Sequence, residues 1–189
     1  MNKRKHEELF YVIISIVGVL VIGTVVTLWM FGQKREYIRY KDPQGRFLME
    51  YPSDWTIADK NKTQGAEVVF VSPKENDLDF FQENFSVIVQ DVPKHLNNLD
   101  MYTKTAIHQM QVVFKSNLVI LKSEPAPLAG RPGHHFVFLG KGPDVEFQYK
   151  IQWALDDSKA YQVTFTAMSS TYENFVPKVE MMMKSFKIL

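Results

Sequence analysis

The sequence contains no cysteine among its 189 residues. This absence excludes disulfide bonds, thiolate metal sites, a cysteine nucleophile and a lipid anchor on an N-terminal cysteine. It leaves the compartment open, because a chain without thiols is compatible with reducing and oxidising surroundings alike.

An excess of charge is missing as well. The 22 Lys and Arg residues are balanced by 21 Asp and Glu residues, which leaves a formal net charge of +1. A protein that binds nucleic acid electrostatically needs a basic stripe or patch, so we expect no nucleic-acid partner. Blocks of like charge and internal repeats are also absent, and the length suits one domain with an appendage.

The motifs that carry most enzyme chemistry are missing too. The sequence has no Gly-x-Ser-x-Gly elbow and no phosphate-binding glycine motif, and we expect Gly130 and Gly133 to belong to a hairpin turn. His134 and His135 are adjacent on a predicted strand, so their side chains should point to opposite faces and not share a metal. The sequence therefore predicts a protein that is not an enzyme and has no catalytic residue, cofactor or metal.

One long apolar run is present near the N-terminus. The stretch from Leu9 to Phe31 has 23 residues and no charged side chain. As a helix it would extend roughly 34 Å, enough to cross a hydrocarbon core of about 30 Å. A cleavable signal peptide has a shorter apolar region and a small-x-small cleavage site, which this run lacks. We predict a basic N-terminal tail at 1–8, a transmembrane helix in the lipid bilayer at 9–31, a short linker at 32–36 and a folded domain at 37–189.

The orientation of this predicted span does not follow from charge. Three basic residues precede the span, whereas five follow it within about 20 residues. A literal positive-inside count favours a cytoplasmic C-terminal domain, but long domains translocate largely regardless of charge. The residues alone leave both orientations open.

Strand-like patterns dominate the remaining sequence. Runs rich in β-branched and aromatic residues, bounded by turn residues, predict strands. These strands are expected at 37–41, 46–51, 67–72, 85–92, 118–121, 133–139, 145–155 and 160–168. The first two flank a turn at 42–45, which makes a hairpin.

Two helices are expected among these strands. One is capped by Asn98 or Asp100 and continues to about Phe114. The other begins near Asn174, because Pro177 is acceptable only in a first turn, and a separate short turn with a capping box precedes it. Its apolar residues recur at helical spacing as one stripe, which comprises Phe175, Val179, Met182 and Phe186. Together the elements predict an α+β domain in which helices pack on an antiparallel sheet.

The segment from Lys74 to Asn84 is the most unusual in the domain. Four acidic residues lie within nine positions, mixed with Leu78, Phe80 and Phe81. The residue order of a calcium-binding EF-hand is absent, so we do not expect a specific calcium site. Two interpretations stay open: the three apolar side chains fold back onto the core, or they form a tip that docks on a partner.

Several segments, taken in order, resemble the PsbP-like family, which comprises the extrinsic photosystem II protein and its bacterial relatives. The matching segments are Tyr51-Pro52-Ser53-Asp54-Trp55, Val69-Phe70-Val71-Ser72-Pro73, Phe85-Ser86-Val87-Ile88-Val89, Gly130 to Gly133, Ala160-Tyr161-Gln162-Val163-Thr164 and Lys184-Ser185-Phe186. The resemblance covers the domain from about residue 37 to the C-terminus. It implies an α/β/α sandwich, with an antiparallel sheet between helices.

The resemblance also implies a non-catalytic protein exported across a membrane. Photosynthetic members help to retain calcium and chloride at the oxygen-evolving complex and dock on membrane subunits. This chain differs from them in its predicted uncleaved span and has no residue-level photosystem motif. Export favours a cytoplasmic N-terminus in a single-pass inner-membrane protein of a bacterium. We therefore expect a membrane-tethered binding or scaffold protein whose extracytoplasmic domain docks on or assists a membrane protein complex. The alternatives are an extracytoplasmic small-ligand-binding protein, a photosystem II-type accessory subunit and an enzyme.

Overall fold

The computed structural model describes residues 36–59, 65–142 and 144–189. The chain divides into a unit of Met1–Glu36 and a unit of Tyr37–Leu189, and the second is described below. The tail predicted at 1–8, the span predicted at 9–31 and most of the linker predicted at 32–36 lie outside the described residues. None of the helices within the described residues is long and apolar enough to cross a membrane.

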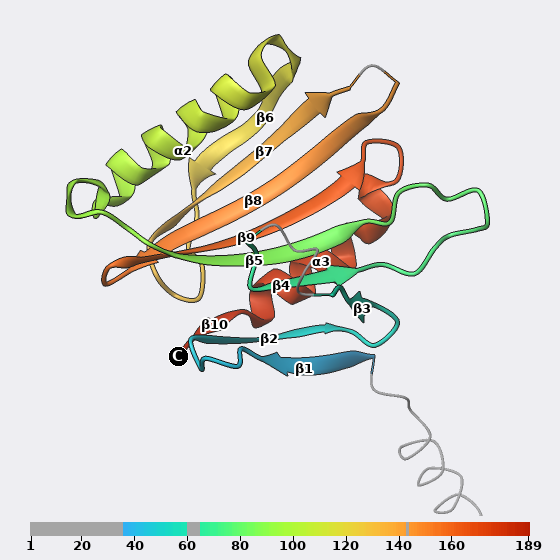
Figure 1. The fold of residues 1–189 in the computed structure, drawn as a ribbon, viewed down its shortest axis with the longest axis horizontal. Coiled ribbons are helices and arrows are strands. Elements are labelled where there is room, and N and C mark those ends of the chain that lie inside the picture. Colours follow the sequence, from blue (N-terminus) through green and yellow to red (C-terminus); the bar gives the residue numbers. More distant parts are fainter. Residues whose placement is uncertain (1–35, 60–64, 143) are drawn as a thin grey trace, which may run out of the picture. The chain divides into compact units, whose positions relative to one another are not determined.

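A seven-stranded antiparallel sheet forms the centre of the domain (Figure 1). In spatial order its strands are β3 (Thr56–Ile57), β4 (Val68–Val71), β5 (Asn84–Asp91), β9 (Lys159–Met168), β8 (Glu146–Asp156), β7 (Gly133–Lys141) and β6 (Leu118–Pro125). Most strands lie within one or two residues of the predicted positions, and β6 extends four residues further than predicted. The longest strands, β8 and β9, pair over ten residues at the middle of the sheet.

A second, three-stranded sheet lies beside the large one. It is formed by β1 (Tyr37–Lys41), β2 (Phe47–Pro52) and β10 (Lys187–Ile188), with β2 in the middle. The predicted hairpin therefore exists, but the expectation of a single sheet is wrong. The reason is that β2 pairs with the C-terminal strand β10, a contact between residues far apart in the sequence.

The C-terminal helix α3 (Tyr172–Ser185) and the small sheet together cover one face of the large sheet. The predicted apolar stripe is confirmed, since Val179 and Met182 are fully buried and Phe186 is 2% exposed. The stripe meets Phe165 on β9 and Phe47 on β2, so three layers share one core. This core is filled with side chains.

The start of α3 differs from the prediction. The helix begins at Tyr172, two residues before the expected start at Asn174, and Pro177 lies inside it rather than in its first turn. The predicted capping box from Ser170 to Glu173 is also wrong, because the N-cap is Thr171 and its side chain makes no cap hydrogen bond. Its hydroxyl group instead donates to the carboxylate of Glu83, a partner that local sequence cannot reveal.

The helix α2 (Leu99–Phe114) covers the opposite face over β6, β7 and β8 (Figure 1). Short 3-10 turns precede and follow it at Lys94–Leu96 and Lys115–Asn117. Of the two predicted caps, Asn98 is the N-cap, and it accepts hydrogen bonds from the backbone amides of Asp100 and Met101. A second core under α2 contains Phe136, Phe138 and Trp153. The domain is thus α+β, with helices on both faces of an antiparallel sheet.

Candidate docking site

The segment between β4 and β5 is a loop ordered by its own side chains. The carboxylate of Asp79 accepts hydrogen bonds from the backbone amides of Glu75 and Phe81, at 3.1 and 3.0 Å. The side-chain oxygen of Asn76 accepts another from the amide of Leu78, at 2.9 Å. Aspartate and asparagine often replace backbone partners in this way, so the loop has a defined shape.

A buried carboxylate fastens the base of this loop to the domain. Glu83 is 1% exposed and accepts hydrogen bonds from the hydroxyl groups of Ser72, at 3.1 Å, and Thr171, at 2.5 Å. Ser72 also donates its backbone amide to the carbonyl oxygen of Glu83. Because Thr171 is the residue before α3, these bonds connect the loop to the start of the helix.

The three apolar residues singled out in this loop do not behave alike. The side chain of Phe81 turns inward and contacts Phe147 on β8, with 4.7 Å between ring centroids. Leu78 and Phe80 point outward and are 89% and 72% exposed. The structure thus places Phe81 in the domain and leaves Leu78 and Phe80 as an exposed pair, which we call the apolar tip.

Charge surrounds this apolar tip. Glu75 and Asp77 are exposed on the same loop, and Lys74 is the basic residue before them. Exposed apolar side chains bordered by polar ones are typical of protein interaction sites. A surface that fits the tip would offer an apolar notch with basic residues at its rim.

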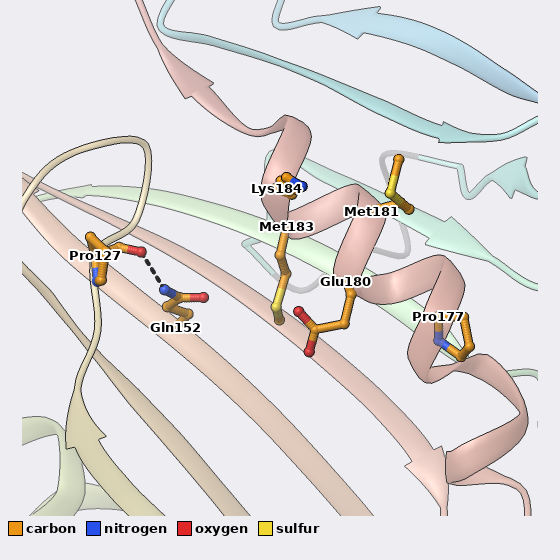
Figure 2. Close-up of a pocket in the computed structure, with 7 residues that line it drawn as sticks. All are labelled: Pro127, Gln152, Pro177, Glu180, Met181, Met183 and Lys184. Carbon is orange, nitrogen blue, oxygen red and sulfur yellow. Dashed lines mark hydrogen bonds between the residues drawn. The ribbon is translucent and has the colours of Figure 1, made fainter.

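A groove that the sequence did not indicate lies along α3 (Figure 2). It has a volume of about 480 Å³ and separates the helix from the segment between β6 and β7. Its lining residues are Pro127, Gln152, Pro177, Glu180, Met181, Met183 and Lys184. The side-chain amide of Gln152 donates a hydrogen bond to the carbonyl oxygen of Pro127, at 2.6 Å, and so connects β8 to that segment. No local motif could have revealed this groove, because its walls are distant in sequence.

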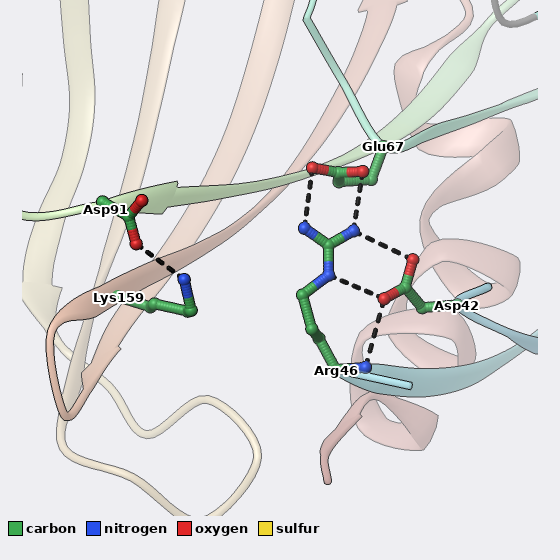
Figure 3. Close-up of polar contacts among 5 residues, drawn as sticks. All are labelled: Asp42, Arg46, Glu67, Asp91 and Lys159. Carbon is green, nitrogen blue, oxygen red and sulfur yellow. Dashed lines mark hydrogen bonds and ion pairs between the residues drawn. The ribbon is translucent and has the colours of Figure 1, made fainter. Parts of the chain in front are cut away.

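One ion-pair cluster joins the two sheets (Figure 3). The guanidinium group of Arg46 pairs with the carboxylates of Asp42 and Glu67, each with a shortest separation of 2.7 Å. Its hydrogen bonds to Asp42 hold the pKa of that carboxyl group below the usual range. A second pair in Figure 3, Asp91 with Lys159, lies on the surface. The charged side chains of the cluster and of the surface pair find their partners within the domain, so we assign a structural role to both sets.

The adjacent histidines lie on opposite faces of β7, as predicted. His134 stacks on Trp153 on the α2 side, whereas His135 lies 3.9 Å from the carboxylate of Glu124 on the other side. Burial lowers the pKa of both rings. No group of three potential metal ligands occurs within the described residues.

Ser123 and His134 form a pair that no sequence motif indicated. The hydroxyl group of Ser123 lies 2.9 Å from Nε2 of His134, because β6 and β7 place them side by side. No carboxylate hydrogen-bonded to this ring is found among the described residues. A triad needs such a group to orient its histidine, so the pair by itself does not define a catalytic site.

Comparisons with known proteins agree with this architecture. The family model described as PsbP matches residues 35–188. Among solved structures, cyanobacterial PsbP (CyanoP) from Synechocystis sp. PCC 6803 is similar with a TM-score of 0.61 and 17% identity, over 83% of this chain and 95% of that chain. A search of curated proteins finds no match.

Two further structures share the fold at lower identity. LpqN from Mycobacterium tuberculosis, described as involved in cell envelope biogenesis, has a TM-score of 0.58 and 8% identity, over 80% of this chain and 90% of LpqN. The Saccharomyces cerevisiae Ran-binding protein Mog1p has a TM-score of 0.57 and 9% identity, over 80% of this chain and 95% of Mog1p. At these identities the likeness extends to the fold alone.

Proposed function

The chain belongs to the PsbP family, and from this premise we propose that it is a membrane-tethered, non-catalytic binding or scaffold protein. Residues 9–31 anchor it in the inner membrane with the N-terminus in the cytoplasm. The PsbP domain stands on the extracytoplasmic side and docks on a membrane protein or complex. An anchor suits such a role, because it raises the effective concentration of a weak binder near membrane partners.

The apolar tip is the observation that carries this proposal. Leu78 and Phe80 add nothing to the core, yet the loop that presents them is held by the bonds of Asp79 and Glu83. Complete burial of one such side chain is favourable by roughly 1.5–3 kcal/mol, so a partner that covers both gains from the contact. A preordered loop also loses little conformational entropy on binding.

The position of the tip supports a partner in the membrane. The loop between β4 and β5 extends from the same end of the domain as the start of β1 (Figure 1). The link predicted at 32–36 is short, which would keep the domain and its apolar tip close to the membrane. The acidic residues beside the tip disfavour insertion into an anionic lipid surface. They favour a protein surface with basic residues.

Relatives with the same fold support protein binding in the cell envelope. Mog1p is a Ran-binding protein, which illustrates that this fold serves protein recognition. LpqN is described as involved in cell envelope biogenesis. Both are distant, so they support the class of function and not a particular partner.

Site-specific photo-crosslinking in membranes tests the docking role. A photoreactive amino acid is placed at Leu78 or Phe80 of the full chain, and at Val112 as the control. Val112 is apolar and 58% exposed, but it lies on α2, away from the loop. We expect both tip positions, and not Val112, to give adducts with one membrane protein. Adducts with lipid alone, or equal yields at all three positions, would contradict the proposal.

The anchor requires a separate test. We expect the native protein to stay in membranes after a carbonate wash, and a reporter fused to the C-terminus to be active only in the extracytoplasmic space. Release by carbonate, or a mature N-terminus beyond Phe31, would exclude the anchor. A cytoplasmic reporter signal would reverse the proposed orientation.

A further inference from the structure

We propose that the groove along α3 binds an extended, acidic peptide segment of a second partner protein. The part shown in Figure 2 continues into a neighbouring hollow of about 560 Å³, with Pro127, Met183 and Lys184 common to both. The second part is bordered by Ala129 and Gly130 on one side and by the end of the chain on the other. The groove is thus long and open, which suits a chain segment rather than a compact ligand.

One wall of the groove is a preformed turn. Leu128 and Arg131 exchange two backbone hydrogen bonds, at 3.0 and 2.9 Å, around Ala129 and Gly130. Both central residues have positive φ, 51° and 76°, as a two-residue hairpin turn requires. Alanine adopts such a φ only at an energetic cost. The turn is held in place because Leu128 is buried, at 1% exposed, in the core that α3 shares with the two sheets. A wall that is already ordered need not be ordered by the ligand.

The opposite wall has an unused strand edge. β10 pairs with β2, and no described strand pairs with its other edge. The segment between β6 and β7 lies on that free side of β10 (Figure 1), and Lys187 and Ile188 line the hollow. An extended segment could add to this edge as a fourth strand of the small sheet. Main-chain hydrogen bonds would then give affinity, and side-chain contacts would give specificity.

The residues at the floor and rim of the groove indicate which kind of peptide segment would bind. Met183 and Phe186 form an apolar floor, and Met181 is 48% exposed beside it. Methionine adapts its shape readily, so this floor accepts various apolar side chains. Lys184 and Lys187 are exposed, and neither has an ion-pair partner among the residues that the structure describes. Two unpaired cations beside an apolar floor favour a segment that alternates apolar and acidic residues.

The charge balance of the groove is cationic despite the presence of one carboxylate. Glu180 lines the groove, but its carboxylate is paired with the ammonium group of Lys150, a residue that is 8% exposed. The long, open form of the groove favours a protein segment over a lipid headgroup as the anion. The apolar tip and the groove would thus hold two different partners.

Peptide binding to the full chain in detergent micelles tests this site. The probe is a fluorescent, end-blocked hexapeptide that alternates valine and aspartate, and lysine replaces aspartate in the control peptide. We expect saturable fluorescence anisotropy with the acidic peptide alone, weaker at high salt. A carbodiimide should couple the peptide to Lys184 or Lys187, as located by mass spectrometry. The same peptide with alternate amides N-methylated should bind more weakly, because it cannot add to a strand edge.

Charge reversal provides the matched protein variants. K184E combined with K187E should weaken binding about tenfold, since each exposed pair contributes modestly. K104E is the control, because Lys104 is an exposed lysine on α2, on the other face of the sheet. The proposal would be overturned if the acidic peptide did not bind saturably or if it coupled to other lysines. An equal loss of peptide affinity in K104E would also overturn it. A sedimentation change caused by the double reversal without peptide would instead assign the groove to a second copy of this chain. Because the apolar tip is unchanged in these variants, failure here leaves the crosslinks at Leu78 and Phe80 intact.

Discussion

The two helices cover opposite faces of one sheet, but they are buried to very different extents. α3 has 14 residues and buries five of them, whereas α2 has 16 residues and buries Tyr102 alone. The difference follows from what lies behind each helix. α3 is packed between the large sheet and the small one, and α2 has the large sheet on one side and solvent on the other. Burial is therefore decided by the layers around a helix and not by its length.

Met182→Ala tests the α3 side and should have the largest effect. Met182 is fully buried between the two sheets, so truncation removes apolar contacts and leaves a cavity. We expect the free energy of unfolding to fall by about 3 kcal/mol, as measured by urea denaturation. A loss below about 1 kcal/mol would mean that the layer can collapse around the missing side chain.

Arg46→Ala tests the ion-pair cluster that joins the two sheets, on the same side of the large sheet as α3. The change leaves the carboxylate of Asp42, whose side chain is 2% exposed, without its cation. We expect a loss of about 2 kcal/mol, less than the roughly 3–5 kcal/mol for a fully buried pair because Arg46 keeps some exposure. Lys159→Ala is the control, since it breaks the surface pair with Asp91 and should leave unfolding unchanged within error.

The stabilisation of the domain by this ion-pair cluster should change with pH in one direction. The pKa of Asp42 is lowered in the fold, so its pairing with Arg46 stabilises the domain fully above the ordinary pKa of aspartate. That stabilisation is lost as the pH falls through the lowered pKa. The difference in unfolding free energy between the wild type and Arg46→Ala should therefore shrink in acid. A difference that stays constant down to that range would exclude the ion pair as its source.

Met110→Ala is the counterpart on α2. The substitution is chemically the same as at Met182, so the change in helix propensity cancels in the comparison. Met110 is only partly buried against the second core, and we expect a loss of about 1 kcal/mol in the same urea experiment. Equal losses at both positions would show that the two layers stabilise the domain equally.

Leu78→Ser combined with Phe80→Ser should have the smallest effect on stability. Both side chains are exposed, so we expect a change within about 0.5 kcal/mol. The same double variant should lose the crosslinked membrane partner, whereas Val112→Ser should retain it. A marked loss of stability would mean that the tip packs on the domain after all.

Local patterns were sufficient for most elements. Patterns between residues two to four apart correctly predicted most strands, the apolar stripe of α3 and Asn98 as one of two candidate caps. The separate small sheet and the early start of α3 were missed. Both depend on contacts between distant segments, namely β2 with β10 and Thr171 with Glu83.

The candidate site was predicted only in part, because it too depends on contacts between distant segments. The loop was identified by its composition, but the sequence could not separate Phe81 from Leu78 and Phe80. That separation depends on Phe147, which lies 66 positions later in the chain and reaches the loop only through β8. The α3 groove was not predicted, because its walls come from segments distant in sequence and neither wall carries a local motif for binding.

The sequence by itself determined what this chain lacks and where its one long apolar run lies. The absence of cysteine, the near balance of charge and the missing nucleophile motifs are properties of composition, and the apolar run at 9–31 is long enough to be identified without a fold. Tertiary structure alone decided which apolar residues of the loop between β4 and β5 became buried and which stayed exposed. The physical reason is that burial depends on the number of layers meeting at a position, and those layers are assembled from residues that the sequence keeps far apart.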